Sequence, residues 1–423
     1  MKEKVVIWMD TLLETAKNSN HQELLAISAM QTAIWDIFAV HGYRMIDTPL
    51  FESYDLYSQY APHIKKDCIK TIDRDGEVLA LRSDITLSLI QSVAQEYKNR
   101  DAYAKYAYIS PVFLPYQGKH SAGHVFLQAG AEIIGSDATD CDSELLDMAL
   151  KIVETLGVTQ CQTAIGSVAY MKGLYEAMNL TKEQQEAFEL AMEARNGMAI
   201  RELSARWHID EEYVTILETL AMSGGPYEDV IETVRSFCKN DTMRNALERL
   251  DRIVRELRWI RPQERIYLEF IASNHLDYYT DMMFKIYALG APYALVSGGR
   301  YNELAGKFGK ARPACGFGLN LQLLREYIEL YGEKKAEDKD LDILIFYSKS
   351  DATIWRSVEI LRHNGWRTIA VKEGTPIHTN EARWVFTYDE AGFTGQSDMS
   401  MQKLLWLTTA EYRDAVDEHT DYR

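Results

Sequence analysis

Hydrophobic residues recur at helical spacing near the beginning of the chain and then give way to shorter apolar runs. In residues 21–41 every third or fourth residue is apolar, which predicts an amphipathic helix that ends at Gly42. The segment 43–51 follows with the character of a strand. Because Pro49 has no N–H to donate, this strand is expected at a sheet edge or a subunit interface.

The next apolar runs predict a short strand, a helix and a hairpin. Residues 78–81 have the pattern of a strand, and residues 84–94 that of a helix whose first position, Asp84, is a favourable cap. Residues 104–113 and 124–134 then flank a polar, glycine-containing connection, as two antiparallel strands do. A strongly periodic helix is predicted over residues 141–157.

The middle of the chain changes character. Residues 180–260 are rich in helix-forming residues and are interrupted mainly at 223–226, so we expect a helical insertion, about 180–260. Strand patterns return at 266–272, 278–289 and 293–297, followed by a predicted turn at Gly298–Gly299 and a glycine-rich strand that runs into a helix at 314–327.

A charged stretch without apolar periodicity, residues 332–340, predicts a linker. Beyond it, 341–346 and 367–371 have strand patterns around a helix at 354–364. We therefore predict a body over 1–331, a linker over 332–340 and a small α/β domain over 341–423.

Composition narrows the classes of function. The formal net charge is −17, and residues 341–423 hold 9 basic and 13 acidic residues, which disfavours a nucleic-acid partner. The five cysteines have no metal-ligand spacing, so we expect reduced thiols, no metal and no cofactor. The sequence shows no secretory signal and no uninterrupted apolar run near the ~20 residues of a membrane span, so a cytoplasmic protein is expected.

A set of short motifs in a fixed order carries a family resemblance. The motifs are YRMIDTPLFE (43–52), LRSDIT (81–86), PVF (111–113), FLQAGAEIIG (126–135), LDYYT (276–280), GGRYN (298–302) and GFGL (316–319). Over about residues 10–330 the chain resembles histidyl-tRNA synthetase, a class II synthetase. The resemblance implies an α+β fold with a mostly antiparallel six-stranded sheet flanked by helices, and a dimer formed through the first helix and the Pro49 strand.

The resemblance also implies that the adenylation machinery is lost. The family's phosphate-binding and carboxylate-binding arginines correspond to Leu114, Leu323 and Asn274, and a further basic position corresponds to His124. A neutral side chain cannot compensate the charge of a phosphate, so we expect no synthetase activity and no catalytic residues. Lys119, His120 and Arg300 are expected nearby, but they are not expected to repair all four sites.

The amino-acid pocket is better preserved. By resemblance, the residues that would hold histidine are Asp84, Thr86, Gln128, Glu132, Tyr278 and Tyr279. Carboxylates and hydroxyls accept hydrogen bonds from an ammonium or an imidazole. Taken alone, Asp84 is equally a helix cap, the tyrosines ordinary strand aromatics, and Glu132 the partner of a structural arginine. Asn274 and the shorter Asp84 leave open a weaker or different ligand.

A synthetase-like body with a preserved amino-acid pocket and no phosphate arginines resembles one paralogous group, the regulatory subunits of ATP phosphoribosyltransferase. That resemblance implies a partner, the short-form catalytic subunit, in a hetero-octamer, with histidine as effector of feedback inhibition in the first step of histidine biosynthesis. Two alternatives stay open: an active, divergent histidyl-tRNA synthetase, and a stand-alone amino-acid sensor or RNA-binding regulator.

Overall fold

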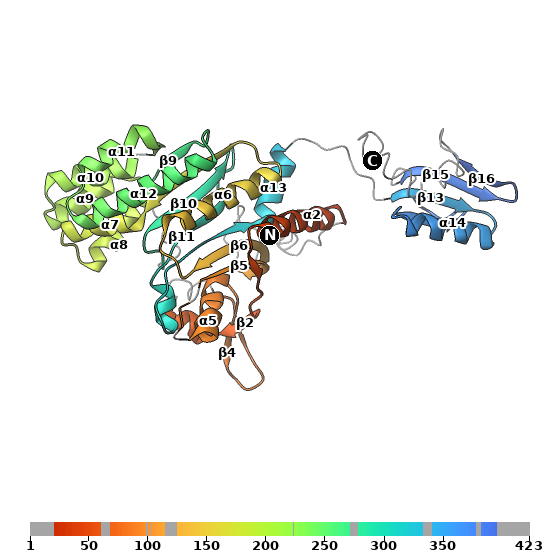
Figure 1. The fold of residues 1–423 in the computed structure, drawn as a ribbon, viewed down its shortest axis with the longest axis horizontal. Helices are drawn as coiled ribbons and strands as arrows, with labels where there is room; N and C mark the ends of the chain where they lie inside the picture. Colours follow the sequence, from red (N-terminus) through yellow and green to blue (C-terminus); the bar gives the residue numbers. More distant parts are fainter. Residues whose placement is uncertain are drawn as a thin grey trace, which may run out of the picture. The chain divides into compact units, whose positions relative to one another are not determined.

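The computed structural model divides into two compact units, Met1–Glu333 and Lys334–Arg423, each described by itself below. It describes residues 21–60, 68–98, 100–101, 103–114, 125–222, 224–270, 278–332, 341–377 and 382–395. Figure 1 shows the elements in chain order.

A nine-stranded sheet forms the centre of the first unit, in the order β1-β5-β6-β12-β11-β10-β7-β9-β8. Its strands are β1 (Arg44–Met45), β5 (Ala104–Phe113), β6 (Val125–Ile134), β7 (Cys161–Ser167), β8 (Gly225–Pro226), β9 (Ile266–Leu268), β10 (Met282–Ala288), β11 (Ala294–Arg300) and β12 (Ala314–Asn320). The six strands from β5 to β7 run antiparallel to their neighbours. The predicted six-stranded sheet is therefore its middle, to which β1, β9 and β8 add two or three residues each at the edges.

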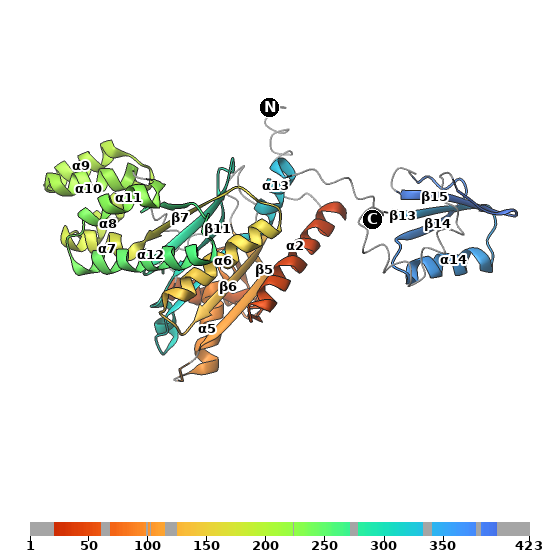
Figure 2. The same ribbon diagram turned by 45° about the horizontal axis from the view of Figure 1, so that its top comes forward.

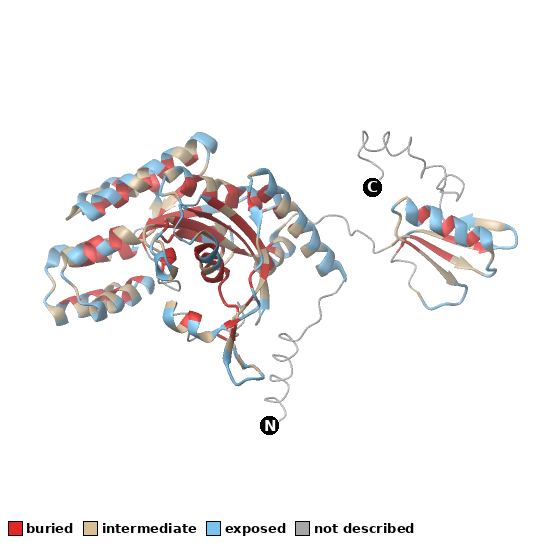
Figure 3. Ribbon diagram, turned by 60° about the horizontal axis from the view of Figure 1, so that its bottom comes forward, coloured by how far each residue is buried: buried red, intermediate tan, exposed pale blue. Residues whose placement is uncertain are grey.

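The alternation of side chains along β6 separates two cores. Ala129, Ala131 and Ile133 point into a core shared with α6 (Thr139–Thr155) and α12 (Asp241–Ile260), two helices that lie side by side across one face of the sheet (Figure 2). Ile134 belongs to a second core on the opposite face, with α5 (Ile85–Tyr97). Buried residues follow this sheet and the helix faces turned towards it (Figure 3).

The N-terminal elements are α2 (His21–Val40), β2 (Phe51–Ser53), α3 (Tyr54–Tyr60), β3 (Lys70–Ile72) and β4 (Val78–Leu81), and β2, β4 and β3 form a small sheet. Of the described helices, α2 is the one that is long and apolar enough to cross a membrane. One such helix is weak evidence for a span, and Ile34, Phe38 and two further residues of α2 are buried within the unit.

The prediction of one strand over 43–51 is wrong. The segment is interrupted between β1 and β2, and Pro49 lies in the interruption. The physical reason is a competing partner: the buried Arg82 guanidinium donates to the carbonyl and, at 2.9 Å, to the hydroxyl of Thr48, and to the Pro111 carbonyl at 2.9 Å. The Arg82 side chain thus binds the middle of this segment, while the Ile46 N–H at one end still donates to the Ala107 carbonyl of β5 at 3.0 Å.

Residues 168–260 contain α7 (Val168–Ala177), α8 (Lys182–Glu193), α9 (Gly197–Trp207), α10 (Glu211–Met222), α11 (Tyr227–Ser236) and α12. Polar caps begin several of these helices: Ser167, Thr181, Asn196 and Asn240 each accept from the backbone N–H of the third residue of the helix that follows. The predicted turn at Gly298–Gly299 is wrong, because both glycines lie inside β11. A Cβ at position 298 would lie 2.6 Å from the Phe284 ring and from the Gly316 carbonyl, so glycine is needed for close packing there.

After η1 (Leu304–Phe308), β12 leads into α13 (Leu321–Tyr331), which packs against α2 and β6. In its described residues, 341–377 and 382–395, the second unit has a four-stranded sheet in the order β14-β13-β15-β16 and one helix, α14 (Ala352–His363). The strands are β13 (Leu341–Tyr347), β14 (Thr368–Lys372), β15 (Ala382–Asp389) and β16 (Gly392–Gly395), and β13 is parallel to β14 and β15. Ile345, Val358 and Phe386 are among its fully buried residues.

Candidate functional site

A buried carboxylate stands at the centre of the site predicted from the sequence. Glu132 lies on β6 and is 1% exposed. Its Oε1 accepts from the Thr86 hydroxyl at 2.7 Å and, at 3.5 Å, from Tyr108, while its Oε2 accepts from Tyr301. Thr86 is in the first turn of α5, Tyr108 lies on β5, and Tyr301 directly follows β11.

A second carboxylate, Asp84, caps the same helix. One of its oxygens accepts from the Leu87 N–H at 2.7 Å, and the other accepts from the Tyr278 hydroxyl at 3.0 Å. The cap and the pocket are therefore not alternatives, because the two oxygens serve both. The Tyr278 ring meets those of Tyr279 and Tyr301 with centroids 5.3 and 5.6 Å away, so an aromatic group connects the two carboxylates.

Glycines on the neighbouring strands make the space for these side chains. Gly316 of β12 pairs with Glu132, and a Cβ there would lie 1.5 Å from the Glu132 Oε2. A Cβ at Gly318 would lie 2.7 Å from the Gln128 amide nitrogen, and one at Gly299 would lie 2.8 Å from the Tyr279 ring. The glycine-rich strands thus form a flat floor that only glycine permits.

The electrostatics of the site favour a hydrogen-bond donor as its ligand. Burial raises the pKa of Glu132 to about 8, and it also raises the pKa of Asp84 above its ordinary value. Among the described residues, no lysine, arginine or histidine forms an ion pair with either carboxylate. An ammonium or an imidazole N–H placed between them would stabilise their charged forms.

Five of the six predicted residues form one connected group, and the sixth, Gln128, lies on the same face of β6. Sequence reasoning missed Tyr108, Tyr301 and Glu52. Tyr301 follows Arg300 in the motif GGRYN (298–302). Tyr108 pairs with Gly130, and a tyrosine opposite a glycine in a predicted hairpin was an available signal.

Glu52 extends the group of buried acids. It is 6% exposed, accepts from the hydroxyls of Tyr57 and Ser88, and has a pKa raised to about 7, chiefly by burial. Three buried carboxylates therefore lie on one side of the sheet, held mainly by neutral hydroxyl donors.

The buried arginines are occupied by the protein itself. Arg82, Arg300 and Arg312 are at most 3% exposed, and each donates to backbone carbonyls. Arg300 also forms an ion pair with Asp142 at 2.9 Å on the α6 face of the sheet, so it is not available to a phosphate.

The predicted positions of the lost arginines are only partly visible. Leu114 packs against the second core directly after β5, and Leu323 lies in the first turn of α13. Asn274, His124, Lys119 and His120 lie outside the described residues. Within the described part of the chain, no group of three or more His, Cys, Asp or Glu side chains could hold a metal ion.

Comparison with known proteins identifies the family. The model of the histidyl-tRNA synthetase family matches residues 16–324, well over half of the chain. The chain belongs to the histidyl-tRNA synthetase family. The class II synthetase-like α+β fold expected from the motifs is confirmed.

Relatives within this family bear one recurring name. An ATP phosphoribosyltransferase regulatory subunit of Ruminiclostridium cellulolyticum is 29% identical over 334 residues, which are 78% of each chain. A protein of the same name from Geobacillus kaustophilus is 26% identical over 329 residues, 78% of this chain and 82% of its own.

Solved structures share the fold. A crystal structure titled as an ATP phosphoribosyltransferase regulatory subunit/histidyl-tRNA synthetase from Bacillus halodurans covers 89% of this chain and 97% of its own, with a TM-score of 0.77 at 22% identity. Histidyl-tRNA synthetase from Nostoc covers 86% of this chain and 88% of its own, with a TM-score of 0.69 at 16% identity.

Proposed function

We propose that this chain is a non-catalytic regulatory subunit of ATP phosphoribosyltransferase that senses histidine. The names of its relatives support the regulatory role. The observation that carries the histidine part is the pair of buried carboxylates, Asp84 and Glu132, with hydroxyl donors around them and no cation paired with either among the described residues.

Histidine fits the donors and acceptors of this site. An imidazole N–H and an ammonium are both donors, and Glu132 and Asp84 each present carboxylate oxygens to accept from them. Binding of a positive group would reverse part of the cost of burying the two charges, so the ligand gains affinity from the same burial that raises the pKa of Glu132. Thr86, Gln128, Tyr278 and Tyr279 complete the proposed pocket.

The same proposal denies the chain an adenylation step. Charge builds up on the phosphates during activation of a carboxylate by ATP, and bidentate guanidinium groups are suited to hold it. With Leu114, Leu323 and Asn274 at the corresponding positions and Arg300 bound to Asp142, the proposed subunit has no set of cations for this task.

The assembly expected from the resemblance is a hetero-octamer with the short-form catalytic subunit, built on a dimer of this chain. Exposed apolar side chains on α2 and around Pro49 support the dimer part of the proposal: Leu24, Val40, Met45, Leu50 and Phe51 are 42–79% exposed. We also propose the division into 1–331, 332–340 and 341–423, a cytoplasmic location, and no nucleic-acid or membrane partner.

The decisive experiment mixes this protein with the short-form catalytic subunit of the same organism and measures phosphoribosyl transfer with and without histidine. We expect activation by this chain and suppression of that activation by histidine. Absence of activation would overturn the regulatory role. Activation that histidine leaves unchanged would keep the regulatory role and remove the sensor.

An active histidyl-tRNA synthetase is the second candidate, favoured by the family model that matches residues 16–324. It predicts histidine-dependent exchange between ATP and pyrophosphate. We expect none, and exchange at the level of a synthetase would replace our proposal.

A further inference from the structure

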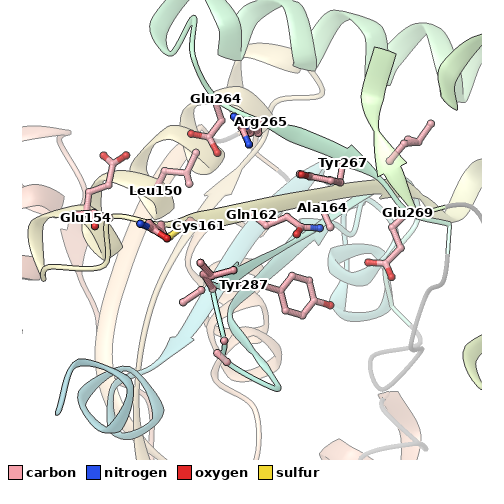
Figure 4. A pocket seen from close by; sticks show the side chains of 18 of the residues that line it. Leu150, Glu154, Cys161, Gln162, Ala164, Glu264, Arg265, Tyr267, Glu269 and Tyr287 are labelled. Atoms are coloured by element: carbon pink, nitrogen blue, oxygen red, sulfur yellow. The ribbon is translucent and has the colours of Figure 1, made fainter. Parts of the chain in front are cut away.

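A polar groove opens at the far end of the same sheet, away from the carboxylates. It has a volume of about 870 Å³ and is lined by β7, β9, the end of β10 and the turn after it, together with Arg195 and Gly224 of the helical insertion (Figure 4). Four strand steps separate Glu132 on β6 from β7, which corresponds to roughly 19 Å at about 4.8 Å per step. The groove is therefore distinct from the proposed histidine pocket.

The floor of the groove has a slot between two aromatic side chains. The central strand β7 contributes the small Ala164, with Tyr267 beside it on β9. Gln162, two residues earlier on the same face, is paired with Tyr287 on β10. Figure 4 shows Gln162 and Ala164 between the two tyrosines. A flat ring can lie over Ala164 with its edge towards the Gln162 amide.

Of the described charged side chains that line the groove, most are paired and one arginine is not. Arg195 is bound to Glu269 at 2.9 Å, and Glu154 is bound by Arg261 at 2.7 Å. Glu264 accepts from the Thr163 hydroxyl at 2.9 Å. Among the described residues, Arg265 has no hydrogen bond and no ion pair, although it lines the groove.

The position of Arg265 indicates where an anionic group of the ligand would bind. Arg265 directly precedes β9 and lies two residues before Tyr267, so in extended backbone their Cα atoms are about 6.6 Å apart. This separation suits a ring joined to an anionic group through a sugar-sized spacer. One unpaired guanidinium next to three carboxylates suits one phosphate and opposes a triphosphate.

We infer that this groove binds a nucleoside monophosphate, with the base over Ala164, its edge on Gln162 and its phosphate on Arg265. A glutamine amide can both donate to and accept from the edge of an adenine. The tyrosine hydroxyls, which have no hydrogen-bond partner among the described residues, are additional donors and acceptors for the ribose. The inference does not depend on the regulatory role proposed above.

The test is calorimetric titration of the full chain with adenosine monophosphate, adenosine and ATP. We expect saturable binding of the monophosphate, and binding at least about tenfold weaker for adenosine, because a charge-assisted contact is lost. Equal affinities for the three compounds, or no binding of the monophosphate, would overturn the inference.

Variants locate the binding. Arg265→Gln should lower the affinity for adenosine monophosphate at least about tenfold and leave the affinity for adenosine unchanged. Arg255→Gln, the same change at an exposed position of α12, should alter neither affinity. Ala164→Leu fills the slot and should lower the affinity for both compounds. Thermal melting of each variant checks the fold. Unchanged affinity in Arg265→Gln and Ala164→Leu would place the nucleotide elsewhere and contradict the inference.

Discussion

The two faces of the central sheet bury ionisable side chains in opposite ways. On the α6 face, Arg300 and Asp142 are both fully buried and form an ion pair, to which Arg249 adds a further contact with Asp142 at 2.7 Å. On the opposite face, Glu132 and Asp84 are buried with hydroxyl and backbone N–H donors, and no ion pair with them is found among the described residues.

This difference distinguishes buried charges that stabilise the fold from buried charges that can bind a ligand. A buried ion pair whose hydrogen bonds are all made is complete, so a ligand can add nothing to it and removal of one partner is costly. Buried carboxylates held by neutral donors are incomplete, because their charged form lacks compensation. A site that waits for a positive ligand has this second construction, and the contrast can be tested on both faces.

The largest expected effect is on the stability contributed by the α6 face, which carries the buried ion pair. Arg300→Met leaves Asp142 buried with only part of its compensation, so we expect the free energy of unfolding to fall by about 3 kcal/mol or more. Denaturant unfolding measures this loss. Arg244→Met, which breaks the exposed pair with Asp241, should cost within about 1 kcal/mol. Similar losses in both variants would contradict the distinction.

On the opposite face, which carries Glu132 and Asp84, Glu132→Gln should change histidine affinity more than stability. The amide keeps the shape and removes the charge, so at pH 5 we expect stability within about 1 kcal/mol of the original, and we expect histidine affinity at least about tenfold lower. Calorimetric titration with histidine checks the affinity. Glu303→Gln, at an exposed position, is the matched control. Unchanged histidine binding in Glu132→Gln would show that the pocket is wrongly assigned.

A smaller effect is expected in the pH dependence of stability. The pKa of Glu132 is about 8 in the folded chain against an ordinary 4.5, so the folded state binds more protons than the unfolded state between these pH values. The contribution of Glu132 to stability is therefore present at low pH and is lost as the pH rises towards 8, by up to about 1.4 kcal/mol per unit.

The measurement compares unfolding free energies of the original chain and Glu132→Gln from pH 5 to 8 without ligand. The decline with pH should be shallower in the variant. Parallel curves would mean that Glu132 is already compensated, and the two faces would then not differ as argued.

Much of the fold could be predicted from local patterns. The strand over 78–81, the helix capped by Asp84 and the hairpin strand over 104–113 lie where periodicity placed them. Periodicity failed where a distant partner decides the conformation. Gly298 and Gly299 have the composition of a turn but are strand residues, because they pair with β10 on one side and with β12 on the other.

The candidate site was predictable to the extent that motifs mark it. The resemblance supplied Asp84, Thr86 and Glu132, which the structure brings together. Glu52 was not predicted as part of the group, because its burial depends on contacts with Tyr57 and with Ser88, 36 residues away. The pairing of Arg300 with Asp142, 158 residues apart, is likewise a tertiary fact that no local pattern contains.

The smallest expected effect comes from restoring one charge. Leu114→Arg returns a guanidinium to one of the positions that the resemblance assigns to phosphate binding. We expect no measurable exchange between ATP and pyrophosphate, because one cation cannot replace a set that acts together on a developing charge, and because Arg300 stays bound to Asp142 on the other face. A synthetase of the same family is the positive control for the exchange assay. Exchange in the variant would mean that the face with Glu132 and Asp84 retains other parts of the adenylation site besides these carboxylates. The chain would then differ from an active synthetase by a single charge.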